Sequence, residues 1–242
     1  MNKGHIYRSV ALVAALAAGA VSHPPGMGRR ERRAVETRVR LFRCALQLFA
    51  EHGFPNVTVE DITEAADVGK GTFFNYFETK EHVLGVMAEI QLGKVREAAS
   101  LAGEGKQAIH SVLHQLVLRL AEEPGRSPSL ARAMISSFLA SEAVRGIIEH
   151  NMREGRMQIA EIVAAGQLRG EIDPRLKKGK VALQFLQSVM GTVLLWSLHG
   201  EPALGEWIED SFQHFWRAIT SSREQEPRDT DFAWPFFWGW PA

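Results

Sequence analysis

Residues 68–77, VGKGTFFNYF, combine four aromatic rings with a lysine, two glycines, a threonine and an asparagine, and they contain no acidic residue. On a helix, Phe73 and Phe77 are four positions apart and share the inward face. The opposite face then carries a cation, a hydroxyl, an amide, a phenol and the edge of a further ring. Its members are Lys70, Gly71, Thr72, Asn75 and Tyr76, with Phe74 between the two faces.

Such a face suits the edges of DNA bases. Lysine donates to guanine O6 and N7, asparagine pairs with adenine through two hydrogen bonds, and threonine or phenylalanine packs on a thymine methyl group. Gly71 allows close approach of the helix backbone. Thr58, Tyr76 and Lys80 are spaced to contact phosphates. A solvated face on an ordinary helical protein is the alternative interpretation, and the preceding basic segment and capped helix favour DNA binding.

The charge distribution also favours a polyanionic partner. The formal net charge of the 242-residue chain is zero. However, residues 28–43 hold seven arginines against two glutamates, while residues 44–67 hold five acids and no lysine or arginine. Local charge, rather than net charge, meets a phosphate backbone. We therefore predict phosphate contacts from the arginines at the start of this segment, Arg29, Arg30, Arg32 and Arg33.

Signatures of catalysis are missing from the sequence. It has no zinc-protease motif, nucleophile elbow or dinucleotide fingerprint, and GKGT at 69–72 lacks the first glycine of a phosphate-binding loop. His110 and His114 have metal-ligand spacing but no identifiable third ligand. Cys44 is the only cysteine, which is typical of a reducing compartment, and we expect it to be a small buried residue. The sequence predicts a cytoplasmic non-enzyme without cofactor or metal.

Helical periodicity runs through the chain and strand signals are nearly absent, so we predict an all-α fold. Thr58, with Asp61 three residues later, forms a capping-box pattern that opens a short helix. Residues 67–69 separate this helix from the next, which begins at Lys70. Two short helices joined by a tight turn are the outline of a helix-turn-helix.

Six further helices are expected at 80–101, 107–122, 129–141, 144–168, 175–199 and 204–219. Asp173 is the expected N-cap before Pro174 at the start of the fifth. The last two helices are too apolar for a single buried face each. A second copy of the chain is the simplest partner for the extra apolar surface, so we predict a homodimer through 175–199 and 204–219. A fully internal position for these helices is the alternative.

The segments RLFRCALQLFAEHGF and TVEDITEAADVGKGTFFNYFETKEHVL make residues 38–84 resemble the DNA-binding domain of TetR/AcrR-family transcriptional regulators. The resemblance implies an all-α homodimer with a three-helix N-terminal helix-turn-helix domain and a larger C-terminal domain for ligand binding and dimerisation. By position, it implies base contacts at Lys70, Gly71, Thr72, Phe74 and Asn75, and backbone contacts at Thr58, Tyr76 and Lys80. Asp67, Gly69 and Phe74 depart from the family's usual turn glycine, capping hydroxyl and tyrosine.

We accordingly divide the chain into four parts: an N-terminal extension at 1–27, a helix-turn-helix DNA-binding domain at 28–87, an effector-binding and dimerisation domain at 88–220, and an aromatic-rich tail at 221–242. The extension has the outline of a secretory signal peptide. A disordered extension, or a start at Met27, agrees better with a cytoplasmic protein.

Candidates for lining a ligand pocket in the C-terminal part are His114, Met134, Phe138, Met152, Met157 and Trp196, each of which also suits an ordinary core position. The predicted function is a repressor that binds double-stranded DNA at a palindromic operator as a homodimer. It would respond to a small hydrophobic ligand and make no membrane contact. A helical small-molecule-binding protein, exported or cytoplasmic and without DNA-binding activity, is the alternative.

Overall fold

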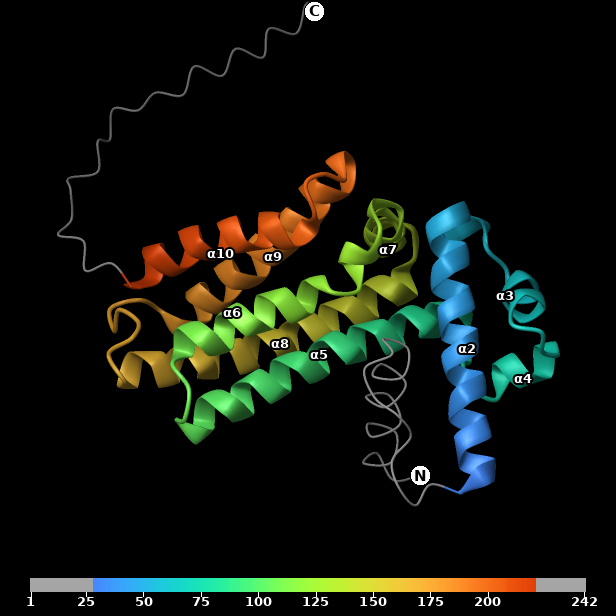
Figure 1. Cartoon of the computed structure of the whole chain (residues 1–242), viewed down its shortest axis with the longest axis horizontal. Coiled ribbons are helices and arrows are strands. Elements are labelled where there is room, and N and C mark those ends of the chain that lie inside the picture. Colours follow the sequence, from blue (N-terminus) through green and yellow to red (C-terminus); the bar gives the residue numbers. More distant parts are fainter. Residues whose placement is uncertain (1–27, 221–242) are drawn as a thin grey trace, which may run out of the picture.

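The computed structural model describes residues 28–220, and every regular element in this range is a helix, as the sequence predicts (Figure 1). The elements are α2 (Arg29–His52), η1 (Phe54–Asn56), α3 (Val59–Ala65), α4 (Lys70–Phe74), α5 (Lys80–Glu104), α6 (Ile109–Ala121), η2 (Pro124–Arg126), α7 (Pro128–Ala140), α8 (Glu142–Leu168), α9 (Lys178–His199) and α10 (Leu204–Thr220). The expectations for the N-terminal extension and the aromatic tail concern residues outside the described range.

At one end of the molecule, α2, α3 and α4 form the predicted helix-turn-helix unit (Figure 1). The expected capping box opens α3, because the Asp61 N–H donates to Thr58 Oγ1 over 3.2 Å and the Thr58 N–H donates to Asp61 Oδ2 over 2.8 Å. Asp67 follows α3 with φ of 50°, the left-handed conformation that an aspartate tolerates in place of glycine. This local chemistry sets the turn that presents α4.

The apolar core beneath α2, α3 and α4 continues into the rest of the chain. It contains Phe73 and Phe77, which hold the α4 segment in place. Its members from beyond the helix-turn-helix are Val83, Leu84, Val86, Met87 and Ile90 of α5, Leu130 and Ala133 of α7, and Val144 of α8. The domain boundary predicted between residues 87 and 88 falls inside the continuous helix α5, and it stays a prediction.

The remaining helices form a C-terminal bundle in which α5, α6 and α8 run alongside one another and α9 and α10 pack on one side (Figure 1). Its core includes Ile109, Leu113 and Leu116 of α6, Ile159 and Ile162 of α8, Phe185 of α9 and Phe215 of α10. α5 contributes to both cores, with its first half in the N-terminal one and Val95, Ala98 and Ala102 in the C-terminal one. α5 is therefore one continuous helix that belongs to both cores and connects the two ends of the molecule.

The predicted start of the helix at 175–199 is wrong, because α9 begins at Lys178. Asp173 does not cap it: its carboxylate accepts the Arg175 N–H over 2.9 Å and the Arg175 guanidinium over 2.7 Å. The amide of Gln167 donates to the carbonyls of Asp173 and Leu176 over 3.0 and 2.8 Å. These bonds hold residues 173–176 in a turn against α8. The Asp173-Pro174 pair therefore forms part of this turn and does not begin a helix.

α9 is long and apolar enough, by length and composition, to cross a membrane, yet its inner face packs in the C-terminal bundle. Its outer face exposes four leucines, Leu183, Leu194, Leu195 and Leu198. The second apolar face expected on α10 is not found, since its apolar side chains pack into the chain's own core. Those side chains are Leu204, Ile208, Phe212, Phe215 and Ile219, with Trp207 and Trp216 partly buried beside them. The unpartnered apolar surface of this helix pair is therefore on α9.

Candidate nucleic-acid interface and apolar cavity

The short helix α4 presents its side chains outward from a buried aromatic base. Phe73 and Phe77 are 0% and 1% exposed, whereas Phe74 is 49% exposed and meets the Phe73 ring edge to face at 5.6 Å. The turn continues beyond Phe74, because the N–H groups of Tyr76 and Phe77 both donate to the Phe73 carbonyl over 2.9 Å. The structure exposes the five predicted base-contacting residues wholly or in part: Lys70, Gly71, Thr72, Phe74 and Asn75.

Within residues 28–220, steric crowding does not require the two glycines at the start of α4. A Cβ atom added at Gly69 or Gly71 would meet no atom within 4 Å, and neither residue has the positive φ that favours glycine. What a Cβ at Gly71 would obstruct is an external partner approaching the helix backbone, which agrees with the predicted contact with DNA.

Lys70 already has an acidic partner in the unbound protein. Its Nζ donates to Oε1 of Glu60 on α3, and both side chains are more than half exposed. This hydrogen bond lowers the pKa of Glu60. The expectation of an acid-free face is therefore correct for α4 alone and wrong for the assembled surface, where α3 supplies a carboxylate. Because solvent screens an exposed pair strongly, Lys70 can exchange Glu60 for a base at little cost.

Lys80 has a role inside the protein. Its ammonium group donates to three backbone carbonyls around η1, those of Phe54 (3.0 Å), Pro55 (3.3 Å) and Val57 (2.8 Å). Nζ also lies 4.7 Å from the centroid of the Phe54 ring. A lysine has three N–H donors, so these bonds use all of them. The phosphate contact of Lys80 stays a prediction, and it must compete with this capping of the turn before α3.

The other two predicted backbone-contact residues lie at the surface. The Thr58 hydroxyl donates to Asp61 Oδ2 over 2.7 Å while it accepts the Asp61 N–H. The Thr58 backbone N–H and the Thr58 hydroxyl, which both donate to the Asp61 carboxylate, lower the pKa of Asp61. The hydroxyl keeps a free acceptor side and no free proton. Tyr76 is partly exposed at the end of the α4 turn. The phosphate contacts of Tyr76 and Thr58 stay predictions, and Thr58 serves first as the cap.

The predicted basic segment is helical. Arg29, Arg30, Arg32 and Arg33 lie exposed on the first two turns of α2. Cations at a helix N-terminus oppose the positive end of the helix dipole, so this cluster does not stabilise its own helix. The predicted phosphate contacts of these arginines stay a prediction.

A cavity of about 160 Å³ lies in the C-terminal bundle among α5, α7, α8 and α9. Three of the six predicted pocket residues line it: Met134 and Phe138 of α7, and Met152 of α8. Its other lining side chains are apolar except for two amides that the sequence reasoning missed, Gln91 of α5 and Asn151 of α8. Amides on otherwise amphipathic helices resemble surface residues, so the sequence carried no signal for them.

The other three predicted pocket residues lie elsewhere. His114 Nε2 is 2.6 Å from Oε2 of Glu209 on α10, and this hydrogen bond lowers the pKa of Glu209. Trp196 is 3% exposed in the core, where its indole N–H donates to the Pro202 carbonyl over 2.9 Å. Met157 is 48% exposed on α8. The sequence shows that these residues are apolar or aromatic. Helical periodicity does not predict which of them lie on the helix face toward the cavity.

The histidine pair and the cysteine, which are residue types capable of binding metals or acting as nucleophiles, make structural contacts. The rings of His110 and His114 stack with centroids 5.8 Å apart, and within residues 28–220 no three His, Cys, Asp or Glu side chains are grouped to hold a metal ion. Cys44 is half-buried, and its Sγ donates to the Ala65 carbonyl over 3.5 Å. Burial raises the pKa of this thiol, which keeps it protonated and unreactive.

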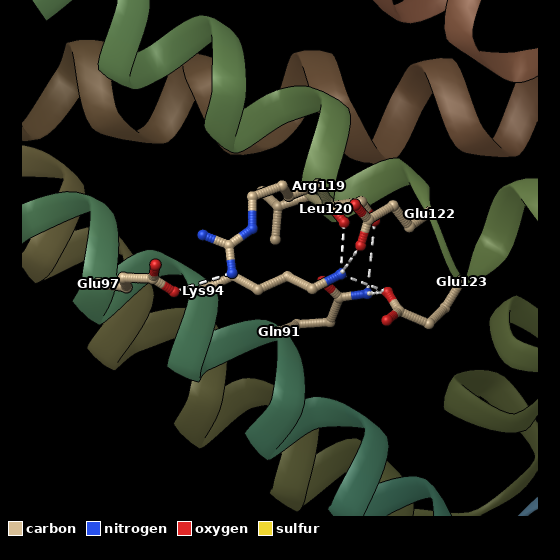
Figure 2. A network of polar contacts seen from close by, with 7 residues as sticks. All are labelled: Gln91, Lys94, Glu97, Arg119, Leu120, Glu122 and Glu123. Atoms are coloured by element: carbon tan, nitrogen blue, oxygen red, sulfur yellow. Dashed lines mark hydrogen bonds and ion pairs between the residues drawn. The ribbon is translucent and has the colours of Figure 1, made fainter. Parts of the chain in front are cut away.

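A buried polar network next to the cavity was also missed (Figure 2). Lys94 of α5 is 8% exposed, and its Nζ donates to Glu123 Oε2 over 2.6 Å, to Glu122 Oε2 over 3.0 Å and to the Arg119 carbonyl. Gln91 joins the same group, since its amide nitrogen donates to Glu123 Oε2 over 3.0 Å. Lys94 lies four residues after Ile90 and four residues before Ala98, both of which are buried. This spacing places Lys94 on the buried face of α5 and could have predicted its burial from the sequence.

The comparisons with known proteins agree with this geometry. A sequence profile described as "Bacterial regulatory proteins, tetR family" matches residues 41–87. The HTH-type transcriptional regulator TcmR of Streptomyces glaucescens is 47% identical over 62 residues. The crystal structure of Thermus thermophilus FadR, a TetR-family repressor in complex with lauroyl-CoA, superposes with a TM-score of 0.56 at 26% identity and covers 78% of this chain and 98% of that one. Residues 41–87 therefore carry the sequence pattern of the TetR family.

The length of the matched part differs among these relatives. The match to TcmR spans 26% of the chain and only 27% of TcmR. The probable acrEF/envCD operon repressor of Escherichia coli K12 is 25% identical over 179 residues, which is 71% of this chain and 80% of that repressor. The strongest identity is therefore confined to a short region of the chain, and matches over most of the chain have lower identity.

Proposed function

We propose that this chain is a TetR-family, ligand-responsive repressor that binds a palindromic operator as a homodimer. The observation that carries the proposal is the exposed face of α4, held on buried Phe73 and Phe77 within the segment that matches the family profile. Lys70 and Asn75 are the side chains on this face that can hydrogen-bond to base edges. The arginines on the first turns of α2 supply phosphate contacts that fix the register.

Dimerisation is supported by the apolar outer face of α9. Leu194, Leu195 and Leu198 are 44%, 53% and 63% exposed within a single helix. A second copy of α9 packed on this face would bury them all. The two α4 helices of such a dimer would enter successive major grooves, which are about 34 Å apart. Palindromic half-sites at that spacing follow from the symmetry.

Ligand response is supported by the cavity and by the position of α5. Thermus thermophilus FadR is described in complex with lauroyl-CoA, so a protein with this fold holds a ligand that carries a long apolar acyl chain. Here Met87 and Leu92 of α5 line the cavity, and the same helix carries Val83 and Leu84 in the core beneath α4. A ligand that shifts α5 would change the spacing of the two recognition helices, provided that it binds one spacing more tightly than the other. A cytoplasmic location follows from access to DNA.

Selection of bound sites from a random double-stranded oligonucleotide pool tests the proposal. The purified chain should enrich one palindromic sequence, and the preference should persist at physiological salt. Lys70→Ala and Asn75→Ala should each weaken binding by about 1–3 kcal/mol and relax the preference at one position in each half-site. Recovery of no common sequence would refute sequence-specific recognition and favour a helical ligand-binding protein.

Two control variants separate base contacts from general charge. Arg32→Ala should weaken binding to all sequences alike and reduce the slope of log K against log salt by about 0.9. Lys180→Ala removes an exposed lysine from α9, far along the chain from α4, and should leave both affinity and slope unchanged. If Lys70→Ala behaved like Arg32→Ala, the assignment of Lys70 to base recognition would be wrong.

Light scattering coupled to size-exclusion chromatography tests the dimer. Leu195→Glu combined with Leu198→Glu should convert the dimer into a monomer, because it places four charges in the paired interface. Leu139→Glu is the matched control, since Leu139 is 78% exposed on α7 and outside the proposed interface. A monomeric wild-type chain, or a double variant that remains dimeric, would contradict the α9 interface.

A further inference from the structure

The cavity among α5, α7, α8 and α9 lies where the two apolar cores of the molecule meet. Leu84 and Met87 line it and belong to the core beneath the helix-turn-helix. Val95 and Val193 also line it and belong to the core of the C-terminal bundle. A molecule bound in this cavity would therefore contact side chains of both cores.

The wall of the cavity carries no charge. Within residues 28–220, the side chains that line it include no Lys, Arg, His, Asp or Glu. Lys94 and Glu123 of the neighbouring polar network pair with each other over 2.6 Å and are not part of the lining. An ion moved into such surroundings loses its hydration and gains no counter-ion. The cavity therefore disfavours a carboxylate, a phosphate or an ammonium group on a bound molecule.

The two amides in the lining do not make the cavity polar. The Gln91 nitrogen donates to Glu123 Oε2 over 3.0 Å, and the Asn151 nitrogen donates to the Ile147 carbonyl over 2.9 Å. The side-chain oxygens of both residues are buried. A molecule in the cavity therefore meets no accessible oxygen on either amide, and a hydroxyl on that molecule would lose its water partners without gaining an acceptor there.

Methionine is concentrated at this cavity. Five methionines lie within residues 28–220, and four of them line the cavity, one from each surrounding helix. They are Met87 of α5, Met134 of α7, Met152 of α8 and Met190 of α9. An unbranched thioether side chain changes conformation easily and fits irregular apolar surfaces. The wall can therefore adjust to apolar molecules of different shape.

The volume of the cavity limits the size of its occupant. The cavity measures about 160 Å³, and an apolar protein cavity of about 150 Å³ stays dry and binds benzene. Pockets for drug-sized ligands are larger, at about 300–1,000 Å³. The cavity therefore matches a single hydrocarbon ring better than a molecule of several rings or a long acyl chain.

We infer that this cavity binds a small, uncharged molecule without a hydroxyl or other strong hydrogen-bonding group, of the size of one hydrocarbon ring, such as an alkylbenzene. This inference rests on the proposed function, because it names the chemical class of the effector. Binding derives its free energy from apolar surface removed from water. A hydroxyl or carboxylate on the same ring loses hydration that the wall does not replace. The site therefore selects against polar groups.

Calorimetric titration of the full-length wild-type chain at pH 7 with three single-ring probes tests the inference. Toluene, phenol and benzoate carry a methyl, a hydroxyl and a carboxylate group on the same ring, and toluene and phenol have nearly the same shape. Toluene should bind saturably and at least about fivefold more tightly than phenol, because burial of an unpaired hydroxyl costs about that factor or more. Benzoate should bind more weakly than phenol. A smaller preference for toluene over phenol, tighter binding of benzoate than of toluene, or no saturable binding of toluene would overturn the inference.

Two glycine substitutions on α8 locate the site. Gly155 lines the cavity, and a Cβ atom added there would be 3.9 Å from Leu92 Cδ1, an ordinary contact. Gly155→Leu should therefore fill part of the cavity and reduce toluene affinity at least about tenfold. Gly146→Leu is the matched control, since Gly146 is exposed on the same helix and is not part of the lining. It should leave toluene affinity within about twofold.

Toluene affinity unchanged in Gly155→Leu, or reduced equally in Gly146→Leu, would overturn the assignment to this cavity. If Gly155→Leu fails to fold, the comparison of toluene with phenol and benzoate in the wild-type chain still decides the ligand class.

The release of DNA is measured separately, by fluorescence anisotropy of the labelled palindrome recovered from the oligonucleotide pool. Release by benzoate or phenol, with binding as tight as that of toluene, would leave ligand-responsive repression intact and refute the inference. Selective toluene binding without any effect on DNA affinity would support the inference and refute ligand response in the proposed function. The two failures are therefore distinguishable.

Discussion

The buried network around Lys94 gives a sharp prediction for stability. In Lys94→Met the side chain keeps its length and apolar stem but loses the ammonium group. The Glu123 carboxylate, whose side chain is 12% exposed, then loses its counter-ion and keeps the amide of Gln91. The carbonyl of Arg119 also loses the lysine donor and keeps only the Glu122 N–H, over 3.3 Å. We expect the variant to fold and to be substantially destabilised.

The magnitude follows from the burial of each partner. Removing one member of a buried ion pair typically costs about 3–5 kcal/mol, because the remaining charge is left uncompensated. Glu122 is 58% exposed and can return to solvent, whereas Glu123 cannot. Glu123 also retains one hydrogen bond, so we expect the lower end of the range, about 3 kcal/mol. For a chain of this length the thermal midpoint should fall by roughly 6–12 °C.

Urea denaturation followed by far-UV circular dichroism, at a fixed protein concentration, measures this loss. Adding Glu123→Gln to Lys94→Met removes the uncompensated charge and should restore about 1–2 kcal/mol. Lys106→Met is the matched control: its side chain is 80% exposed and pairs with Glu104 over 3.1 Å, so its removal should cost under about 1 kcal/mol. A loss below about 1 kcal/mol for Lys94→Met, or a double variant less stable than it, would refute the reasoning.

Three further predictions concern other parts of the fold. Lys80→Met leaves three carbonyls around η1 without their donor, so we expect a loss of about 2 kcal/mol in unfolding free energy with an unchanged salt slope of DNA binding. Thr58→Ala removes the cap of α3 and should cost about 1 kcal/mol in the same denaturation assay. The hydrogen bond from His114 lowers the pKa of Glu209 below its ordinary 4.5. This bond therefore stabilises the fold above about pH 4.5 and is lost as the pH falls through the lowered pKa, so the stability of His114→Phe should depend less on pH below 4.5 than that of the wild type.

Each of these predictions has a contradicting outcome. A salt slope reduced by about 0.9 with unchanged stability in Lys80→Met would restore its predicted phosphate contact. Thr58→Ser keeps the hydroxyl and should be nearly neutral, so equal losses for serine and alanine would exclude capping as the cause. If the unfolding free energies of the wild type and His114→Phe changed in parallel with pH, the hydrogen bond from His114 would not stabilise ionised Glu209.

Features set by neighbours along the chain were predictable from the sequence. The capping box at Thr58 and Asp61 needs only a spacing of three residues, and it formed. The inward positions of Phe73 and Phe77 follow from their spacing of four. The left-handed Asp67 follows from the need for a turn between two short helices. In each case the deciding contacts are local, so periodicity and turn chemistry are sufficient.

Features set by contacts between distant segments were not predictable. Glu60 reaches Lys70 only because the turn folds α3 beside α4. Lys80 meets the carbonyls around η1 across 23–26 residues of sequence. Gln91 of α5 and Asn151 of α8 line one cavity because α5 packs on α8, and spacing within one helix does not predict this packing.

The apolar cluster that joins the helix-turn-helix to Leu130, Ala133 and Val144 has a consequence for engineering. A recognition module grafted from this chain onto a foreign regulator would leave part of its base uncovered, because α7 and α8 complete that base here. Chimeras cut at residue 87 should therefore be less soluble and less cooperative on unfolding than chimeras that carry α7 and α8 along. The transferable module of this protein is larger than its recognition motif.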